Sequence, residues 1–242
     1  MPRLNKWMAD GMEKLFQSQF RPVEVSDTTY FYDRLKRVRF QGDLSGASFT
    51  PGNVIEFRIN DEEFRHYTPA DLDVEQGTCE VLFYLHDLGP GSRWAEALAV
   101  GASLNLMGPG RKMSFRTDAA EHLLFGDESS LGLALSFARA AATTGTRCRF
   151  LLELDDANKT WPDALGLSDA TVFTSSSTPG AAASQWVEDL DDQAWHRLSA
   201  GAVYLTGQAA SIQRLYQRLK KRGLSRQRIQ STPYWSAGKS GL

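Results

Sequence analysis

Hydrophobic and polar residues alternate in short runs through the first half of the chain. Glycines separate these runs, which lie at residues 29–40, 53–59, 79–85 and 102–107. A period of two residues is typical of strands with one buried face. Because several short strands follow one another between residues 20 and about 110, the pattern predicts a small antiparallel β-barrel.

The pattern changes near residue 120, where short apolar runs begin to alternate with helical ones. Strands are predicted near 122–126, 148–154, 170–174, 201–206 and 227–230, and helices near 131–143 and 208–222. Such alternation predicts a parallel sheet. The segment 174–180, together with the alanines after it, is predicted to be a loop. At the other end, residues 4–18 have the apolar spacing of an amphipathic helix.

These elements predict three parts. A helical extension occupies residues 1–19, a β-barrel domain residues 20–116, and a smaller parallel-sheet α/β domain with a basic C-terminal segment residues 117–242. A chain of 242 residues is long enough for two domains of ordinary size and for a core that needs no disulfides. The predicted fold class is therefore a β-barrel plus an α/β domain.

The charge of the chain is unevenly distributed. The net charge of −2 argues against a general nucleic-acid binder. No acidic residue follows Asp192, whereas the basic residues after it are Arg197, Arg214, Arg218, Lys220, Lys221, Arg222, Arg226, Arg228 and Lys239. A cationic patch of this kind concentrates anionic ligands; the alternative is a solvated helix whose basic end complements its own dipole.

The sequence offers little for metal binding, secretion or membrane insertion. Its two cysteines, Cys79 and Cys148, form no CxxC pair, and its four histidines lack HxxxH or HExxH spacing. No apolar run approaches the roughly 20 residues that a membrane-spanning helix needs, and the first residues lack the layout of a signal peptide. We therefore expect a cytoplasmic protein without a metal site.

The first candidate site lies at residues 64–69, after the alternating run 54–59. Arg65 and Tyr67 are two residues apart, so on a strand they project from the same face. Thr68 follows, just before a proline that must end the ladder. A cation, a flat ring and a hydroxyl in one patch suit a flavin nucleotide, which has phosphates, a planar ring system and a hydrogen-bonding edge. The alternative is a barrel strand with an exposed arginine and a half-buried tyrosine.

The second candidate site is the turn at residues 86–95, between an apolar strand and a short helix. Gly89 and Gly91 let the backbone approach a ligand closely, and Ser92 is a suitable N-cap. A glycine-rich turn before a helix N-terminus is an anion site, apt for a pyrophosphate. The alternative is an ordinary capped turn.

Two further turns, at residues 126–132 and 203–208, join a strand end to a helix. Open parallel sheets bind ligands at such carboxyl ends, although neither turn carries GxGxxG. Two acidic pairs, at 155–156 and 191–192, are predicted to lie in solvated polar loops rather than to act as acid and base. No Ser-His-Asp arrangement is supported, because Ser129 lacks the GxSxG elbow.

The first two motifs resemble those of a known family. Arg65-x-Tyr67-Thr68 is similar to the flavin-binding signature of ferredoxin-reductase-like flavoproteins, and among these the chain looks most like the siderophore-interacting proteins, which are flavin-dependent ferric-siderophore reductases. The turn at 86–95 resembles that family's His-x-x-Gly-Pro-Ala-Ser-x-Trp-Ala motif, with Gly91 in place of the alanine. The two motifs occur in order and about 20 residues apart, which is far more specific than either alone.

Three weaker likenesses follow towards the C-terminus. The 126–132 turn resembles the family's Gly-Asp-Glu-Thr turn, with Ser129 in the threonine position and a glycine where proline is common. Gln208 stands where a glutamate often follows the glycine. Residues 233–239 resemble a terminal Gly-Tyr-Trp-Arg-Arg-Gly-Lys segment, with serine and alanine in place of the two arginines.

The resemblance implies a ferredoxin-reductase-like fold whose barrel binds FAD. The residues that it assigns to this cofactor are Arg65, His66, Tyr67, Thr68, His86, Gly89, Pro90, Gly91, Ser92 and Trp94. For the second domain it implies docking of NADPH or NADH, at Asp127, Glu128, Ser129, Gly207, Gln208 and Trp235.

The resemblance also implies individual roles. Arg65 would pair with the flavin phosphates, and the turn at 89–94 would hold the pyrophosphate. The catalytic residues would be Tyr67, against the isoalloxazine ring, and Thr68, at its reactive N5 edge. From the charge of the C-terminal segment, Arg228 and Lys239 are expected to contact the substrate.

The implied activity is reduction of a ferric siderophore or other ferric chelate, with electrons from NAD(P)H or a reduced carrier and release of ferrous iron. Reduced flavin can give electrons singly, as a ferric centre requires. Two other classes stay open. One is an electron-transfer reductase with a ferredoxin- or flavodoxin-like partner, which a basic surface would serve. The other is a siderophore- or flavin-binding protein without turnover.

Overall fold

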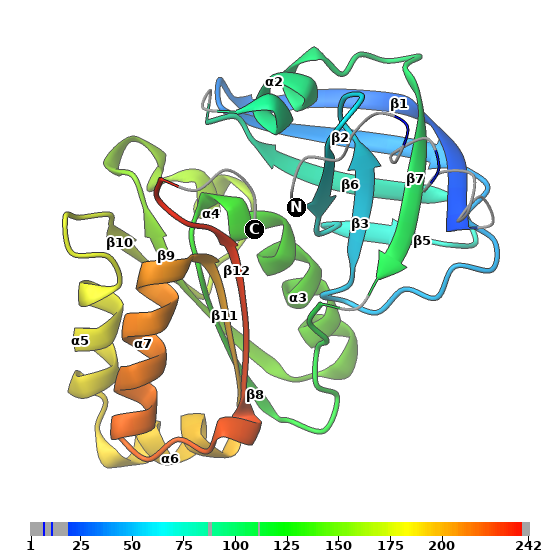
Figure 1. Ribbon diagram of the computed structural model, residues 1–242. Helices are drawn as coiled ribbons and strands as arrows, with labels where there is room; N and C mark the ends of the chain where they lie inside the picture. Colours follow the sequence, from blue (N-terminus) through cyan, green and yellow to red (C-terminus); the bar gives the residue numbers. More distant parts are fainter. Residues whose placement is uncertain (1–6, 8–10, 12–18, 87–88, 111, 239–242) are drawn as a thin grey trace. The chain divides into compact units, whose positions relative to one another are not determined.

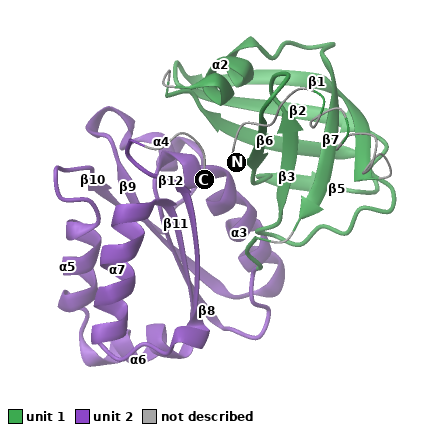
Figure 2. Cartoon of the chain, in the orientation of Figure 1, with its two compact units in different colours: residues 1–114, 241 green, residues 115–240, 242 purple. Residues whose placement is uncertain are grey.

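The computed structural model describes residues 7, 11, 19–86, 89–110 and 112–238. The helix expected at 4–18 lies almost entirely outside these residues, and so does Lys239. The chain divides into two compact units, residues 1–114 and residues 115–240 (Figure 2). Because the second unit spans more residues than the first, the expectation of a smaller second domain is wrong.

Unit 1 is built on one antiparallel sheet (Figure 1). Its seven strands are hydrogen-bonded in the order β4-β3-β7-β1-β2-β6-β5, and every neighbouring pair is antiparallel. The antiparallel β-domain predicted for this part of the chain is confirmed. In chain order its elements are β1 (Phe20–Tyr32), β2 (Leu35–Gly42), β3 (Val54–Arg58), β4 (Phe64–Tyr67), β5 (Asp71–Asp73), β6 (Thr78–Tyr84), α2 (Pro90–Ala97) and β7 (Ser103–Gly110).

One predicted strand of unit 1 is in fact two. Residues 29–40 form a single apolar run in the sequence, but they cross a tight turn at Asp33 and Arg34, where Tyr32 pairs with Leu35. The turn joins β1 to β2 as a hairpin. Aromatic and apolar residues flank the two polar turn residues directly, so the hydrophobic pattern shows no break there.

The strands of unit 1 curl around one apolar core, to which alternate residues of each strand contribute (Figure 1). On β2 the inward residues include Val38 and Phe40. From α2, Ala95 joins the same core, followed by Leu98 just after the helix. The helix is therefore packed against the sheet that carries the first candidate site.

Unit 2 alternates strands and helices around a second sheet. Its five strands are all parallel, in the order β10-β9-β8-β11-β12, so the predicted parallel sheet is confirmed. The strand order reverses between β8 and β11, which makes their carboxyl ends the topological switch point. In chain order the elements are β8 (Glu121–Gly126), η2 (Glu128–Ser130), α3 (Leu131–Thr144), β9 (Arg147–Leu154), η3 (Asp156–Asn158), α4 (Trp161–Ala164), β10 (Ala170–Thr174), α5 (Ala181–Asp189), α6 (Asp192–Ala200), β11 (Ala202–Gln208), α7 (Ala209–Lys221), η4 (Arg226–Arg228) and β12 (Ile229–Trp235).

Helices cover both faces of this sheet. On β11, the Tyr204 ring lies 4.7 Å from Phe137 of α3, whereas Val203 and Leu205 pack with Ile212 of α7 on the other face. Strands buried on both faces are apolar almost throughout. That is why these segments appear in the sequence as short continuous apolar runs without alternation.

Three boundaries in unit 2 differ from the prediction. The alanines after residue 180 begin α5 instead of extending a loop, in keeping with the high helix propensity of alanine. Asp191 accepts a hydrogen bond from the Ala194 N–H at 2.7 Å and so caps α6, whereas a loop was expected at 191–192. The last strand runs from Ile229 to Trp235, so the prediction of 227–230 was too short. It is an edge strand, where a proline is tolerated.

Candidate functional site

In unit 1, Arg65 and Tyr67 converge on the first turn of α2. Both belong to β4 and pair with β3 residues that face the core, so they share the inner side of the sheet. A Cβ atom at Gly91 would lie 3.2 Å from Tyr67 Oη and 3.5 Å from Arg65 Cγ. The two sequence motifs therefore meet at one place, and little room remains beyond the Gly91 backbone.

Aromatic rings surround Tyr67. Its ring stacks on Trp94 with centroids 5.8 Å apart and planes inclined by 16°, and it meets Phe83 edge-on at 4.8 Å. Phe57 lies 5.4 Å from Trp94. Such contacts fix the orientation of the Tyr67 ring. Burial raises the pKa of the Tyr67 hydroxyl, which therefore stays protonated and able to donate.

Arg65 is oriented by its own strand. Its Nη2 forms an ion pair with Glu63 Oε1 at 3.2 Å, and its Nη1 donates to the Phe64 carbonyl at 2.9 Å. The side chain is only 20% exposed, so the alternative of an exposed surface arginine does not apply. A guanidinium has five N–H donors. The described contacts use two of them, which leaves donors for a bidentate contact to a phosphate.

Helix α2 presents its N-terminus beside these two side chains. Its N-cap is Gly89, whereas Ser92 lies buried inside the first turn, so the expected Ser92 cap is wrong. Pro90 occupies the first helical position, where its fixed φ starts the helix earlier. The first N–H groups of a helix have no partner within it. Pro90 has no N–H, so in this turn it is the Gly91 N–H that stands beside the guanidinium, as donors of the kind that a pyrophosphate needs.

The other predicted residues of unit 1 lie on two faces. His86 approaches the α2 turn, since a Cβ atom at Gly89 would be 3.8 Å from its Cε1. Thr68 directly follows β4 and is half-buried. His66 instead projects to the outer face, with Nε2 3.7 Å from Glu56 Oε2, and does not join the Arg65–Tyr67 cluster. Burial lowers the pKa of His66 to about 4, so its imidazole is neutral at pH 7.

In unit 2, the carboxyl end of β8 leads into a buried carboxylate. Asp127 accepts hydrogen bonds from the Ser129 N–H at 3.0 Å, from the Ser129 hydroxyl, and from Trp235 Nε1 at 2.7 Å. The backbone of Gln208 also contributes a bond. Burial nevertheless raises the pKa of Asp127, because the group is only 7% exposed. The switch point is thus built around an internal anion.

Gly207 is required beside this anion. Its φ is +90°, and a Cβ atom there would lie 2.5 Å from Asp127 Oδ2. Both the backbone conformation and the close approach demand glycine. The structure therefore brings together five of the residues predicted for nucleotide binding, which are Asp127, Ser129, Gly207, Gln208 and Trp235.

Glu128, the sixth of these residues, also points inward. Its Oε1 accepts the Asp155 N–H at 2.7 Å and Asn158 Nδ2 at 2.8 Å, and burial raises its pKa. It therefore ties the end of β8 to the end of β9. The N–H groups that bond Asp127 and Glu128 are directed at the protein's own carboxylates, so they are not open to a phosphate.

The sequence analysis missed another buried acid next to this site. Glu153, near the end of β9, accepts the Gly180 N–H at 2.8 Å and the Ser211 hydroxyl at 2.6 Å. It connects the loop before α5 to the start of α7. The available signal was the one charged residue of the apolar run 150–154, in a strand that both faces of the sheet bury.

The basic C-terminal segment is largely engaged in internal contacts. Arg222 donates to three backbone carbonyls at or just after the end of α5. Arg218 pairs with a glutamate of α5, and Lys220 donates to a carbonyl just after α7 at 3.0 Å. These residues are therefore better explained by contacts within the protein than by binding of an anionic ligand. Arg226 is exposed and Arg228 half-buried, so these two stay candidates for an anionic ligand.

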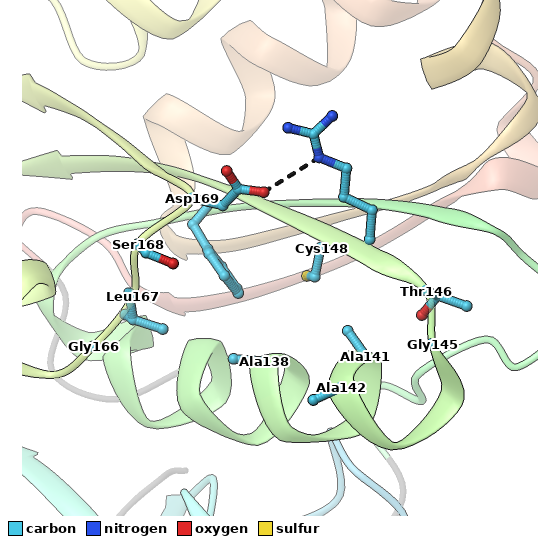
Figure 3. Close-up of a pocket in the computed structure, with 12 residues that line it drawn as sticks. Ala138, Ala141, Ala142, Gly145, Thr146, Cys148, Gly166, Leu167, Ser168 and Asp169 are labelled. Atoms are coloured by element: carbon cyan, nitrogen blue, oxygen red, sulfur yellow. Dashed lines mark hydrogen bonds and ion pairs between the residues drawn. The ribbon is translucent and has the colours of Figure 1, made fainter.

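A cavity of about 340 Å³ opens at the opposite, amino-terminal edge of the same sheet (Figure 3). It lies between the second half of α3 and the starts of β9 and β10, and small residues line most of it. Its charged lining residues, Arg147 and Asp169, pair with each other at 3.2 Å. Burial raises the pKa of Cys148 to about 12, so this thiol is unreactive. The cavity is therefore no part of the switch-point site.

The described residues contain no group of three or more histidines, cysteines or acids that could hold a metal ion. Over the same residues, no helix is long and apolar enough to cross a membrane.

The chain has an antiparallel sheet, on which a cation lies beside a helix N-terminus, and then a parallel sheet with a turn at its switch point. This order of domains is that of the ferredoxin-reductase-like class. Phthalate dioxygenase reductase has this fold, with a TM-score of 0.74 at 14% identity over 93% of this chain and 71% of that one. A siderophore utilization protein from T. fusca gives a TM-score of 0.74 at 24% identity over 92% and 95% of the two chains. The siderophore-interacting protein SipS from Aeromonas hydrophila gives 0.73 at 19% identity over 92% and 93%.

Two family models place the chain within this class. Residues 53–113 match the siderophore-interacting FAD-binding domain, and residues 119–238 match the siderophore-interacting protein model. Together they cover about three quarters of the chain. No curated protein sequence gives a significant match. The chain belongs to the siderophore-interacting protein family.

Proposed function

We propose that this protein is an FAD-dependent reductase that takes electrons from NAD(P)H or a reduced carrier and passes them to a ferric siderophore or other ferric chelate. The observation that carries the proposal is the convergence of Arg65, Tyr67 and the first turn of α2 around Gly91. The match of residues 53–113 to an FAD-binding domain supports the same site. In this proposal unit 1 is the FAD-binding domain and unit 2 the nucleotide-binding domain.

The residues of unit 1 have roles that follow from their positions. Arg65 and the N–H groups of the α2 turn bind phosphate oxygens. The Tyr67–Trp94 stack forms a rigid aromatic wall, and the Thr68 hydroxyl at the end of β4 supplies a hydrogen bond at the reactive edge. Bound FAD would supply the ability to accept an electron pair and release it one electron at a time.

Reduction releases the metal because a ferrous ion is held less tightly by hard oxygen ligands than a ferric ion. One NAD(P)H carries two electrons, so its oxidation reduces two ferric ions and releases one proton. Arg226 and Arg228 would attract a ferric chelate with net negative charge; Arg228 and Lys239 are the residues proposed to contact it.

A reduced protein carrier is the second candidate donor, and one observation favours it. At the switch point of unit 2 the backbone donors of Ser129 and Gln208 bond to Asp127. A dinucleotide phosphate would have to compete with this carboxylate. An acidic ferredoxin- or flavodoxin-like carrier would instead meet the exposed cations of unit 2, and turnover would then fall as salt is raised.

The compartment follows from the proposed donors. NAD(P)H and reduced carriers are cytoplasmic, and Cys79 and Cys148 are both buried cysteines without a disulfide partner. Free thiols are the rule in a reducing compartment. We therefore propose that the protein works in the cytoplasm.

An anaerobic assay tests the proposed function. The purified protein is loaded with FAD and mixed with NADH, NADPH or a reduced carrier, a ferric siderophore and a ferrous-specific chelator. We expect yellow protein, loss of flavin absorbance on addition of the donor, and two trapped ferrous ions per NAD(P)H consumed. Protein that stays colourless with FAD contradicts the flavin site. Flavin that is reduced without any trapped ferrous iron contradicts ferric-chelate reduction, and flavin that no donor reduces points to binding without turnover.

A further inference from the structure

A buried lysine of β2 caps the C-terminal end of α2. Lys36 Nζ donates to the carbonyl oxygens of Ala95 at 3.1 Å, Glu96 at 2.8 Å and Leu98 at 2.7 Å. An ammonium group has three N–H donors, so these three acceptors use all of them. The last carbonyls of a helix have no partner within it. A positive charge there also offsets the helix dipole.

Lys36 stands where the pattern of β2 requires an apolar residue. Lys36, Val38 and Phe40 share one face of the strand, and the last two belong to the core. The Lys36 residue is only 2% exposed, and burial lowers its pKa. Burying an ammonium is costly unless its donors are satisfied. Packing therefore does not explain why a lysine occupies this position. The hydrogen bonds to the three carbonyls at the end of α2 do explain it.

The helix that Lys36 fixes is the one that forms the flavin site. Ala95 lies about one helical turn after Gly91, and the same helix stacks Trp94 on Tyr67. The helix has only eight residues, and its N-cap makes no side-chain hydrogen bond. Short helices depend on tertiary contacts for their position. The tie to β2 is such a contact, at the end opposite the phosphate-binding turn.

We propose that Lys36 is a positioning residue for flavin binding. By fixing the C-terminal end of α2, it keeps the phosphate-binding turn against Arg65. The inference rests on the proposed FAD site and deepens it with a residue outside the matched span 53–113. Lys36 acts through the helix, because its ammonium donates to carbonyls at the far end of α2.

The test compares Lys36→Met with Val38→Ala, which removes core packing two residues along the same face of β2. FAD and riboflavin affinities are measured by titration of the flavin-free protein, and thermal midpoints by calorimetry. Riboflavin is the probe without phosphates. We expect Lys36→Met to raise the FAD Kd about tenfold and the riboflavin Kd less than threefold, as loss of about one charge-assisted contact predicts. Val38→Ala should lower the midpoint while the FAD Kd changes less than about threefold.

The outcomes separate this inference from the proposed function. Equal losses for FAD and riboflavin in Lys36→Met, or unchanged FAD affinity, would overturn the positioning role. Wild-type protein that binds no FAD would instead refute the flavin site itself. If Lys36→Met does not fold, Lys36→Gln, which keeps two N–H donors, is tested in its place. Its FAD Kd must again rise more than its riboflavin Kd. Non-additive FAD losses in Lys36→Met combined with Arg65→Ala would support action on one turn.

Discussion

The protein contains two glycine-bearing turns that open a helix, one in each unit, and their electrostatics are opposite. In unit 1 the turn before α2 faces the Arg65 guanidinium and an aromatic stack. In unit 2 the turn after β8 encloses the Asp127 carboxylate, which accepts bonds from Ser129 and Trp235. A helix N-terminus attracts an anion in either case. Unit 2 fills that place with its own side chain, whereas in unit 1 we propose that a ligand takes it.

This difference shows that a turn motif of this kind predicts an anion at the helix N-terminus. It does not tell whether that anion is a ligand or a side chain of the protein. The decisive feature is the charge of the nearest side chain, which comes from a different part of the fold in each unit. Arg65 arrives from β4, whereas Asp127 belongs to the turn itself. Mutations at these two turns should therefore have different kinds of effect, on ligand affinity in unit 1 and on stability in unit 2.

The largest effect is expected for Gly207→Ala. The added Cβ would lie 2.5 Å from Asp127 Oδ2, and φ is +90°. Backbone strain and overpacking together should cost about 3–5 kcal/mol of the free energy of unfolding, measured by urea denaturation. Gly223→Ala is the matched control, because its φ is +94° but nothing lies within 4 Å of the added atom. Equal losses in the two variants would show that contact with Asp127 is unimportant.

Arg65→Ala should have the next largest effect, on FAD affinity. Loss of a charge-assisted contact costs about 1.5–3 kcal/mol, or about 10- to 150-fold in Kd. Fluorescence titration of the flavin-free protein measures it. Arg58→Ala removes another partly buried arginine of unit 1, which donates to the carbonyls of Asn60 and Asp61. Wild-type affinity in Arg65→Ala, or the same loss in Arg58→Ala, would contradict the site.

Asp127→Asn should change how the stability of unit 2 depends on pH. Burial raises the folded-state pKa of Asp127 above its unfolded value. Its contribution is therefore complete below the unfolded pKa and is lost as pH rises through the folded pKa. The free energy of unfolding of the wild type, minus that of the variant, should be smaller at pH 7 than at pH 4. Denaturant titrations at both values measure this difference, and a constant or rising difference would contradict a strained buried charge.

Thr68→Ala should slow reduction of the bound flavin about tenfold, as expected when one hydrogen bond at a reacting edge is lost. FAD occupancy should change much less, because the phosphate contacts stay intact. Stopped-flow absorbance under anaerobic conditions measures the rate. Thr68→Ser keeps a hydroxyl and serves as the control. A rate that falls equally in both variants would exclude a role for the hydroxyl.

The sequence predicted the two sheets and the meeting of Arg65 with Tyr67, because strand periodicity fixes which residues share a face. It could not predict that Arg65 pairs with Glu63 or that Glu128 ties β8 to β9, since these contacts depend on side-chain orientation. The hairpin inside 29–40 was missed because apolar residues flank its turn. Lys36 did leave a signal, a charge in an inward-facing position of β2, but its partners come from a distant helix.

The smallest effect is expected for Gly91→Ala, the unit 1 counterpart of Gly207→Ala. The added Cβ would lie 3.2 Å from Tyr67 Oη, so the tyrosine must move by a few tenths of an ångström. Alanine is also a better helix former than glycine by about 1 kcal/mol, which offsets this crowding. We expect a change in the free energy of unfolding below about 1 kcal/mol and an FAD Kd within about threefold of the wild type. A loss as large as that of Gly207→Ala would mean that the Tyr67–Trp94 stack cannot shift, and that the two turns are equally rigid despite their opposite charge.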